Sequence, residues 1–249
     1  MTVTDSPAKP RPGSLLYSAY AWTVFVLCLT VAFAGAALLP GLERRRRWVS
    51  YFARLFFRLA GIRTEIRGLE NLPAGHCVVV ANHASYLDGP ILQAFLPPRF
   101  TYVIKSEMQK VPAAGFMLKR IGSRFVERFN ATARTRDTRS LLRAADSGEA
   151  LGFFPEGTFQ LEPGLGRFRS GAFMTAVKSE VPLVPVVIHG SRWILPAETF
   201  LARHGRLTLD ILPPVAPGDP EFAKHKAVAA VARERMLAVL EEPDLLART

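Results

Sequence analysis

Two residues that could exchange a proton, His83 and Asp88, lie five positions apart in the segment ANHASYLDGP, which follows the apolar run CVVV. A neutral imidazole is suited to accept a proton near pH 7, and a carboxylate can orient the ring. Five residues put two side chains about 140° apart around a helix and on opposite faces of a strand. A loop must therefore fold back if the two are to meet. In the alternative interpretation, Asp88 is the N-cap of a helix with Pro90 in its first turn, and His83 is an ordinary loop residue.

A second candidate site follows another apolar run, in the segment ALGFFPEGTF from 150 to 159. Pro155 ends the predicted strand and leaves Glu156, Gly157 and Thr158 in a loop. A glycine lets a ligand approach the backbone closely, and a carboxylate at the end of a buried strand has to be exposed or paired. The same letters also fit a plain turn between a strand and a loop.

Basic residues occur near both segments. Arg167 and Arg169 precede Ser170, a potential N-cap, and cations beside a helix N-terminus favour a phosphate group. Arg124 and Arg128 are an even number of positions apart, so an extended chain places both on one face. These arginines predict anion-binding positions, but a solvated loop and a basic sheet edge explain them equally well.

The elements around these segments alternate between strands and helices. Strands are expected at 76–81, 101–104, 124–127, 150–154, 183–189 and 206–212, and helices near 90–95, 131–145, 171–179 and 221–241. Strands that are apolar on both faces are typical of a mostly parallel sheet covered by helices on each side. We therefore predict an α/β domain from 61 to 249, with its site where strands end and loops begin.

The first sixty residues have a different character. Residues 1–14 are rich in proline and predict a flexible tail. Residues 15–39 carry no charged side chain and, at about 1.5 Å per residue, are long enough for a tilted crossing of a ~30 Å hydrocarbon layer. The cluster ERRRR at 43–47 favours a retained anchor with that side in the cytoplasm over a cleaved signal peptide. A hairpin that enters and leaves one leaflet is a further alternative.

The rest of the 15–60 region predicts an amphipathic helix. Trp48, Phe52 and Phe56 recur at helical spacing on one face, while Arg54 and Arg58 fall toward the other. Such a helix can lie in the membrane interface, with its arginines drawn to anionic head groups. It can also pack on the core of the domain like any amphipathic helix.

Charge and composition narrow the choice of partner. The 249-residue chain has a net charge of +11 and a pI near 10.2, which indicates an anionic partner such as a phosphate-bearing lipid or membrane surface, nucleic acid or a phosphorylated substrate. Its basic residues are dispersed, without a stacking-aromatic module, which speaks against nucleic acid. Two isolated cysteines fit a reducing compartment. His189, His204 and His225 have no partners at metal-ligand spacing, so we expect no metal site.

In order and spacing these segments resemble the membrane-bound glycerolipid acyltransferases typified by bacterial 1-acyl-glycerol-3-phosphate acyltransferase. The matching segments are NHASYLD at 82–88, FVER at 125–128, FPEGT at 154–158, FRSGAF at 168–173 and VPVVI at 184–188. A His-x4-Asp pair alone is a weak signal, but the pair followed by FPEGT about seventy residues later is a specific one. The resemblance runs from about 68 to 212.

This resemblance implies the transfer of an acyl chain from a thioester to the free hydroxyl of a lysophospholipid, in the first place 1-acyl-sn-glycerol-3-phosphate. The donor is acyl-coenzyme A or acyl carrier protein, used as a co-substrate, and no cofactor is implied. His83 becomes the general base and Asp88 orients it. Glu156, Gly157 and Thr158 help to bind the acyl acceptor. The enzyme is expected at the inner cell membrane, with its catalytic domain on the cytoplasmic face.

Three cations are implied to face the phosphate of the acceptor: Arg128, Lys105 and Arg169. One position departs from the family pattern, because many members carry an arginine directly after FPEGT, where this chain has Phe159. Arg167 or Arg169 then supplies the missing charge, or the acceptor is a different lysolipid. The sequence leaves the acceptor head group, the donor carrier and the chain length open.

Two functions of other classes compete with this one. A serine hydrolase is suggested by Ser85 inside the key loop, but the chain contains no G-x-S-x-G elbow. A non-catalytic lipid-binding or membrane-scaffolding protein accounts for the anchor and the arginines. It does not account for His83, Asp88 and Glu156 at loop positions where strands end.

Overall fold

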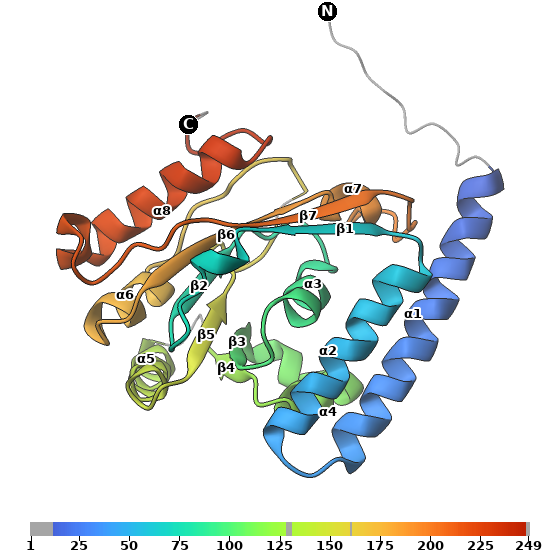
Figure 1. Ribbon diagram of the computed structural model, residues 1–249, viewed down its shortest axis with the longest axis horizontal. Coiled ribbons are helices and arrows are strands. Elements are labelled where there is room, and N and C mark those ends of the chain that lie inside the picture. The colour runs from blue at the N-terminus through green and yellow to red at the C-terminus, as the bar shows by residue number, and fades with distance from the viewer. Residues whose placement is uncertain (1–11, 128–130, 160, 248–249) are drawn as a thin grey trace, which may run out of the picture.

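The protein is described by a computed structural model that covers residues 12–127, 131–159 and 161–247. Within these ranges a sheet of seven strands forms the centre, in the spatial order β1-β7-β6-β2-β5-β3-β4 (Figure 1). The strands are β1 (Arg63–Arg67), β2 (Val78–Ala81), β3 (Phe100–Lys105), β4 (Arg124–Val126), β5 (Ala150–Phe153), β6 (Leu183–His189) and β7 (Arg206–Ile211). Neighbouring strands in it run parallel except β6 and β7. The predicted α/β class with a mostly parallel sheet is confirmed.

Helices cover both faces of the sheet (Figure 1). The helices are α1 (Pro12–Leu38), α2 (Leu42–Leu59), α3 (Asp88–Phe95), α4 (Pro112–Arg120), α5 (Ala131–Asp146), α6 (Gly171–Lys178), α7 (Ser191–Ile194) and α8 (His225–Val239). One core packs α1, α2 and α3 against Val79 and Val184, and the other packs α5, α6 and α8 against Val78 and Leu183. Because successive strand residues point to opposite faces, a strand between two helical layers must be apolar throughout, as β2 is.

α1 and α2 form an antiparallel hairpin, joined by residues 39–41. At the open end of the hairpin, the Tyr17 hydroxyl donates to the carbonyl of Ala60 at 3.0 Å. Nearer the closed end, the Trp48 indole donates to the carbonyl of Val31, also at 3.0 Å. The hairpin is thus tied together along most of its length.

The arginines at the start of α2 lie in different environments. Arg46 is buried, and its guanidinium donates to the carbonyls of Ile121 at 2.8 Å and Arg99 at 3.0 Å and to the Thr101 hydroxyl at 2.6 Å. Arg44 is exposed. Part of the basic cluster therefore fixes α2 to the domain and does not face a lipid surface.

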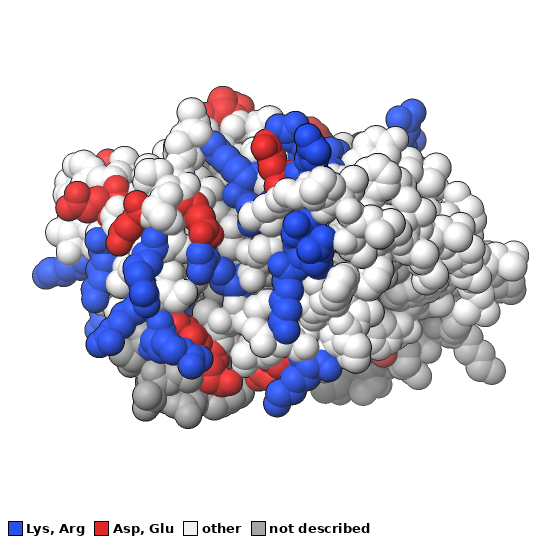
Figure 2. Space-filling view, turned by 90° about the horizontal axis from the view of Figure 1, so that it is seen from below, with Lys and Arg blue, Asp and Glu red and all other residues white. Residues whose placement is uncertain are grey.

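The outer face of α1 is apolar. Residues Ser14–Leu38 form a helix that is long and apolar enough to cross a membrane, with a mean hydropathy of 2.1 and one third of the segment buried in the protein. Leu16, Leu27 and Leu38 are among its most exposed side chains. On the face shown in Figure 2, the end of the molecule formed by α1 and α2 has few charged side chains, whereas Lys and Arg gather over the rest. This apolar end is the part of the surface suited to lipid.

Several elements differ from those predicted. β1 reads RTEIR and is exposed at every position on the sheet edge, so it has no apolar run to reveal it. α4 was not predicted either. α8 begins at His225, after a short 3-10 turn at Pro220–Ala223, where one helix was expected from 221 to 241. α1 already begins at Pro12, so the last residues of the predicted 1–14 tail are helical, and residues 1–11 lie outside the described residues.

Candidate active site

The site lies where β2 and β5 end side by side. The two strands pair in parallel, with Val80 opposite Phe153, so the loops that follow them leave the same edge of the sheet. Asn82, the first residue after β2, is buried, and its side-chain amide donates to the carbonyl of Ile188 at 3.0 Å and accepts the amide of the same residue at 2.7 Å. This pair of bonds to β6 fixes the start of the loop that carries the histidine.

His83 and Asp88 meet across this loop. The imidazole Nδ1 lies 2.8 Å from Asp88 Oδ2, and the same oxygen accepts the backbone amides of Ala84 at 2.6 Å and Ser85 at 2.7 Å. Because two amides fix Oδ2 as an acceptor, we assign the ring hydrogen to Nδ1 and the free lone pair to Nε2. Asp88 is fully buried, while the His83 side chain keeps 19% of its surface exposed.

The alternative in which Asp88 caps a helix is wrong. α3 begins at Asp88 itself, and no side chain caps its first turn. The carboxylate turns back toward the amides that precede it in the chain. The five-residue interval is therefore spanned by a loop that folds back.

Glu156 joins this loop to two others. Its Oε1 accepts the backbone amide of His83 at 2.8 Å, and its Oε2 accepts the amide of Gly166 at 2.7 Å. The residue is 9% exposed. With both oxygens engaged, the carboxylate holds the backbone of His83 in place from the β5 side.

The surroundings of Glu156 change its acidity. Burial raises the pKa of the Glu156 carboxyl, and the negative charge of Asp88 adds to the effect. The amides of His83 and Gly166 and the charge of the imidazole oppose it, without cancelling it. Glu156 therefore binds a proton more readily than a glutamate in water does.

The backbone of Gly166 is in turn held by hydrogen bonds from a side chain of α8. Arg233 donates to the carbonyl of Gly166 at 2.5 Å and to that of Leu165 at 2.8 Å, and it pairs with Asp244. A continuous set of hydrogen bonds thus runs from the C-terminal segment through Gly166 and Glu156 to the backbone of His83.

Aromatic rings flank the imidazole. Phe154 stacks on it, with ring centroids 4.2 Å apart and planes at 20°. Phe159 and the imidazole form a T-shaped pair, with centroids 4.9 Å apart and planes at 78°. The position after FPEGT, where a cation is common in the family that the sequence resembles, here places an apolar ring against the catalytic candidate.

The other predicted residues of the FPEGT region lie close by in the chain. Gly157 has a φ of 85°, in the left-handed region that favours glycine, and is buried, while Thr158 is exposed. The backbone amide of Arg169 donates to the carbonyl of Pro155 at 2.8 Å, and the Arg169 side chain is exposed. Arg169 is therefore next to the Glu156 loop through its backbone.

The predicted cations of the β3–β4 side are less closely tied to the pair. Lys105 is the last residue of β3, which pairs with β5, and its half-buried side chain has no carboxylate partner in the described part of the chain. Arg128 lies outside the described residues. Arg124, which was predicted to share a face with it, forms an ion pair with Glu149 at 2.5 Å. Arg124 therefore neutralises a carboxylate of the protein.

Ser85 is placed to support the loop. It is fully buried, and its hydroxyl donates to the carbonyl of Leu195 at 2.8 Å and accepts the amide of Leu87 at 3.2 Å. A hydroxyl engaged with the backbone in this way, away from solvent, is poorly placed to attack a substrate.

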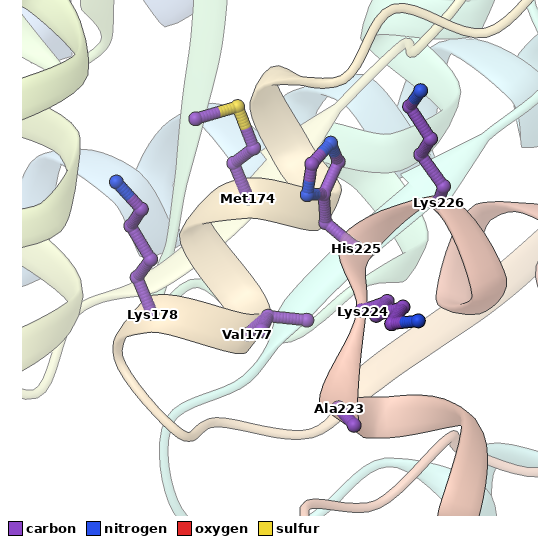
Figure 3. A pocket seen from close by; sticks show the side chains of 7 residues that line it. All are labelled: Met174, Val177, Lys178, Ala223, Lys224, His225 and Lys226. Atoms are coloured by element: carbon purple, nitrogen blue, oxygen red, sulfur yellow. The ribbon is translucent and has the colours of Figure 1, made fainter.

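A hollow of about 260 Å³ lies between α6 and the start of α8, lined by Met174 and Val177 together with Lys178, Lys224 and Lys226 (Figure 3). It lies by the amino ends of β2 and β6, opposite the edge that carries His83, because α6 ends just before β6 begins. It is therefore not part of the site. Among the described residues, no three His, Cys, Asp or Glu side chains gather so that they could hold a metal ion.

Comparison with known proteins identifies the family of this chain. The acyltransferase family model matches residues 63–189, which contain His83, Asp88 and Glu156. The 1-acyl-sn-glycerol-3-phosphate acyltransferase of Saccharomyces cerevisiae is 28% identical over 212 residues, which cover 82% of this chain and 69% of the yeast protein. The human 1-acyl-sn-glycerol-3-phosphate acyltransferase beta is 31% identical over 200 residues, covering 75% of this chain and 69% of the human one.

Other relatives are longer. A chloroplastic 1-acyl-sn-glycerol-3-phosphate acyltransferase of Brassica napus is 30% identical over 177 residues, and the match covers 69% of this chain but only 51% of the plant protein. The chain thus spans about half the length of that relative. Among solved structures, the 1-acyl-sn-glycerophosphate acyltransferase PlsC of Thermotoga maritima has the same fold, with a TM-score of 0.73 over 91% of this chain and 96% of that one, at 23% identity.

Proposed function

The chain belongs to the acyltransferase family, and on that premise we propose that it transfers a fatty acyl group from a thioester to the free hydroxyl of 1-acyl-sn-glycerol-3-phosphate, which yields phosphatidic acid. The names of the yeast and human relatives support this choice of acceptor. The observation that carries the proposal is the contact of 2.8 Å between the partly exposed imidazole of His83 and the buried carboxylate of Asp88.

His83 acts as the general base. Its Nε2 lone pair takes the proton of the acceptor hydroxyl while the hydroxyl oxygen forms a bond to the thioester carbonyl carbon. An alcohol is a poor nucleophile until this proton is removed, and such assistance contributes about 10²- to 10⁴-fold in rate. The carbon–sulfur bond then breaks, and the thiolate takes up the proton held by the imidazolium. A thiol with a pKa of ~8.5 leaves readily, so no stronger acid is required.

Asp88 keeps the His83 ring in the tautomer and orientation that a general base requires. Its Oδ2 holds Nδ1 in the protonated form and stabilises the positive charge that develops on the ring. Because the two backbone amides already fix this oxygen, the imidazole is oriented before substrate binds. Phe154 restricts rotation of the ring from the side.

The acceptor phosphate is proposed to bind cations at the same edge of the sheet. Lys105 ends β3, and Arg169 follows the FPEGT loop. Arg128, which lies outside the described residues, is added to this set on the resemblance of the sequence alone. Gly157 and Thr158 would lie beside the glycerol backbone of the acceptor, with the left-handed turn at Gly157 allowing close approach. Glu156 takes part indirectly, by fixing the amide of His83.

Attachment to a membrane is proposed to occur through the outer face of α1. α1 stays in contact with the domain from the Tyr17 bond to Ala60 up to the Arg120 guanidinium, which donates to the carbonyl of Ala36 at 2.7 Å. A helix tied to the domain at both ends cannot cross a bilayer without drawing the arginines of α2 into hydrocarbon. Of the two placements that the sequence leaves open, the hairpin lying in one leaflet fits these contacts. The anionic cytoplasmic face of the cell membrane is the proposed location of this basic protein.

Purified protein in liposomes tests the reaction. Labelled acyl-coenzyme A and acyl carrier protein thioesters are supplied in turn, each with a panel of lysolipids that differ in head group. We expect label to move to 1-acyl-sn-glycerol-3-phosphate and free thiol to appear in equal amount. If the protein consumes no thioester with any of the lysolipids, the proposal is contradicted.

The same assay separates this function from a serine hydrolase. Ser85→Ala should keep acyl transfer at temperatures where the variant is folded, because the hydroxyl serves the loop backbone. Loss of turnover in Ser85→Ala together with full activity in His83→Ala would assign the chemistry to the serine.

A further inference from the structure

A series of aromatic side chains leads away from the catalytic histidine along the surface. Phe159, which meets the His83 ring in a T-shaped arrangement, contacts Tyr86 with ring centroids 4.8 Å apart. Tyr86 in turn stacks on Phe200, with centroids 5.4 Å apart and planes at 19°. Tyr86 is 54% exposed and Phe200 52% exposed, so these rings do not owe their positions to burial in a core.

Phe200 is held in an unusual backbone conformation. Its φ is 49°, in the left-handed region that non-glycine residues seldom occupy and that often marks functional positions. The carbonyl of Phe200 accepts the Trp22 indole at 2.9 Å, and the amide of Ala202 donates to the Ser18 hydroxyl at 3.0 Å. Both bonds come from α1. The segment after α7 is thus fastened to α1 in a way that presents the Phe200 ring to the outside.

The series therefore connects the active site to the apolar helix. Figure 1 shows the segment after α7 lying beside the first turns of α1. Trp22, which bonds to the carbonyl of Phe200, also meets the ring of Phe25 within α1, with ring centroids 5.5 Å apart. Exposed Leu16 and Tyr20 lie on the same part of α1. The aromatic contacts thus run from His83 to Phe200, and the backbone of Phe200 is bonded to α1.

We propose that Phe159, Tyr86 and Phe200 form the binding track for the acyl chain that the lysolipid acceptor already carries. This inference rests on the proposed function and adds the place where the hydrocarbon tail of the acceptor lies. A single-chain lipid is amphipathic, and its tail needs apolar contact while its head leaves the bilayer to reach His83. The track begins at α1, and it therefore serves the substrate that comes from the membrane and not the water-soluble thioester.

The track also gives Phe159 a role. The ring joins the tail-binding surface to the imidazole, so the free hydroxyl next to the acylated carbon of the acceptor arrives at the base while the tail rests on Tyr86 and Phe200. Phosphate binding is then left to cations elsewhere on the sheet edge, such as Lys105 and Arg169.

Phe200→Asn, which removes the aromatic ring without forcing a change of the backbone conformation, tests the track. In Phe200→Asn the left-handed conformation is retained, because asparagine tolerates positive φ better than most residues, while the apolar surface is lost. The kcat/KM for an oleoyl lysophosphatidic acid should fall about tenfold, mainly through KM, and that for a hexanoyl analogue less than about twofold. Phe200→Tyr should restore the oleoyl value.

A matched control is available on α7. Trp193 is 60% exposed, and its ring contacts the guanidinium of Arg203 outside the series. Trp193→Asn should leave the ratio of oleoyl to hexanoyl kcat/KM unchanged. Equal losses in Trp193→Asn and Phe200→Asn, or a Phe200→Asn effect that follows the chain length of the thioester, would overturn the proposal.

A second measurement reads binding without turnover. A lysophosphatidic acid with a photoactivatable diazirine in the middle of its chain is crosslinked to the wild-type protein in vesicles, and the modified residues are mapped by mass spectrometry. We expect adducts on Tyr86, Phe200 and the first turns of α1, competed by unlabelled oleoyl acceptor. Adducts confined to other surfaces would overturn the track even where acyl transfer is active, whereas absent transfer with these adducts present would count against the proposed function alone.

Discussion

Asp88 Oδ2 accepts two backbone amides and contacts the imidazole, so one atom both shapes the loop and orients the ring. Glu156 divides its two oxygens in a similar way between His83 and Gly166. In both cases a buried carboxylate satisfies backbone donors, and the position of the reactive group follows from these bonds. Precision at this site is therefore built from amide contacts of short loops.

The raised pKa of Glu156 predicts how stability depends on pH. Because the folded-state pKa is raised above that of the unfolded chain, with burial as the main cause, the stabilisation from its proton is present at low pH and is lost as pH rises through the folded pKa. Relative to Glu156→Gln, which cannot titrate, the wild type should gain stability as pH falls from neutral toward about 4.3, by about 1.4 kcal/mol per unit of pKa difference. Urea unfolding of both proteins in detergent across this range measures it. If acidification instead lowers the free energy of unfolding of the wild type relative to that of Glu156→Gln, the assigned direction of the Glu156 pKa shift is contradicted.

The residues that could carry out acyl transfer are recognisable in the sequence, but only some of their contacts are. His83, Asp88 and Glu156 stand out because polar groups follow apolar strands. The bond from Glu156 to the amide of His83 depends on the pairing of β2 with β5, which no local pattern specifies. Arg233, which holds Gly166, lies far along the chain in an ordinary amphipathic helix and carries no signal of its own.

At the scale of elements, α2 shows that neighbouring arginines of one basic cluster can have different roles. Arg46 enters the protein and bonds to three acceptors, while Arg44 stays outside. A guanidinium can satisfy several carbonyls at once because its donors diverge in a plane. The start of α2 is thereby fixed to the loops around β3 and α4.

This arrangement predicts different effects of two neighbouring substitutions. Arg46→Met should lower the free energy of unfolding by about 2 to 4 kcal/mol, because it leaves the carbonyls of Ile121 and Arg99 without the donors that they have in the wild type. Arg44→Met, at an exposed position, should change it by less than about 0.5 kcal/mol. Chemical denaturation in detergent compares the two. Equal stability of both variants would show that the Arg46 contacts contribute little.

The elements that were predicted from the sequence are those with a regular spacing of apolar residues or with a continuous apolar run. The strands β2, β5 and β6 and the helix α1 are of this kind. β1 was missed because three of its five residues are charged and all five are exposed on the sheet edge, and α4 because its short sequence starts with proline and contains glycine. The antiparallel return of β7 beside β6 is a property of the chain path, which periodicity does not encode.

At the scale of the whole molecule, the apolar hairpin and the site occupy connected parts of one surface. The segment after α7 bonds to α1 through Trp22 and Ser18, and the carboxyl edge of the sheet lies beside it. Under the proposed function, a membrane that covers the outer face of α1 would bring a lipid acceptor to the edge where His83 lies.

Charge placed on the outer face of α1 should separate membrane binding from folding. The double variant Leu16→Glu/Leu27→Glu should reduce co-sedimentation with anionic vesicles at least about tenfold, since each exposed leucine contributes on the order of 1.5 kcal/mol or more when transferred from water to lipid. Its thermal unfolding in detergent should change little. Leu69→Glu, at a residue 51% exposed on the far edge of the sheet, is the control and should bind like wild type. Unchanged binding of the double variant would exclude α1 as the attachment surface.

The central claim is that His83, oriented by Asp88, removes the proton from the acceptor hydroxyl. The most direct measurement is kcat/KM for acyl transfer to 1-acyl-sn-glycerol-3-phosphate in vesicles by the wild type, His83→Ala, Asp88→Ala and the double variant. We predict a loss of about 10²- to 10⁴-fold in His83→Ala, and a double variant no slower than His83→Ala, because Asp88 acts through the imidazole. Full activity in His83→Ala, or losses that simply multiply in the double variant, would contradict the account.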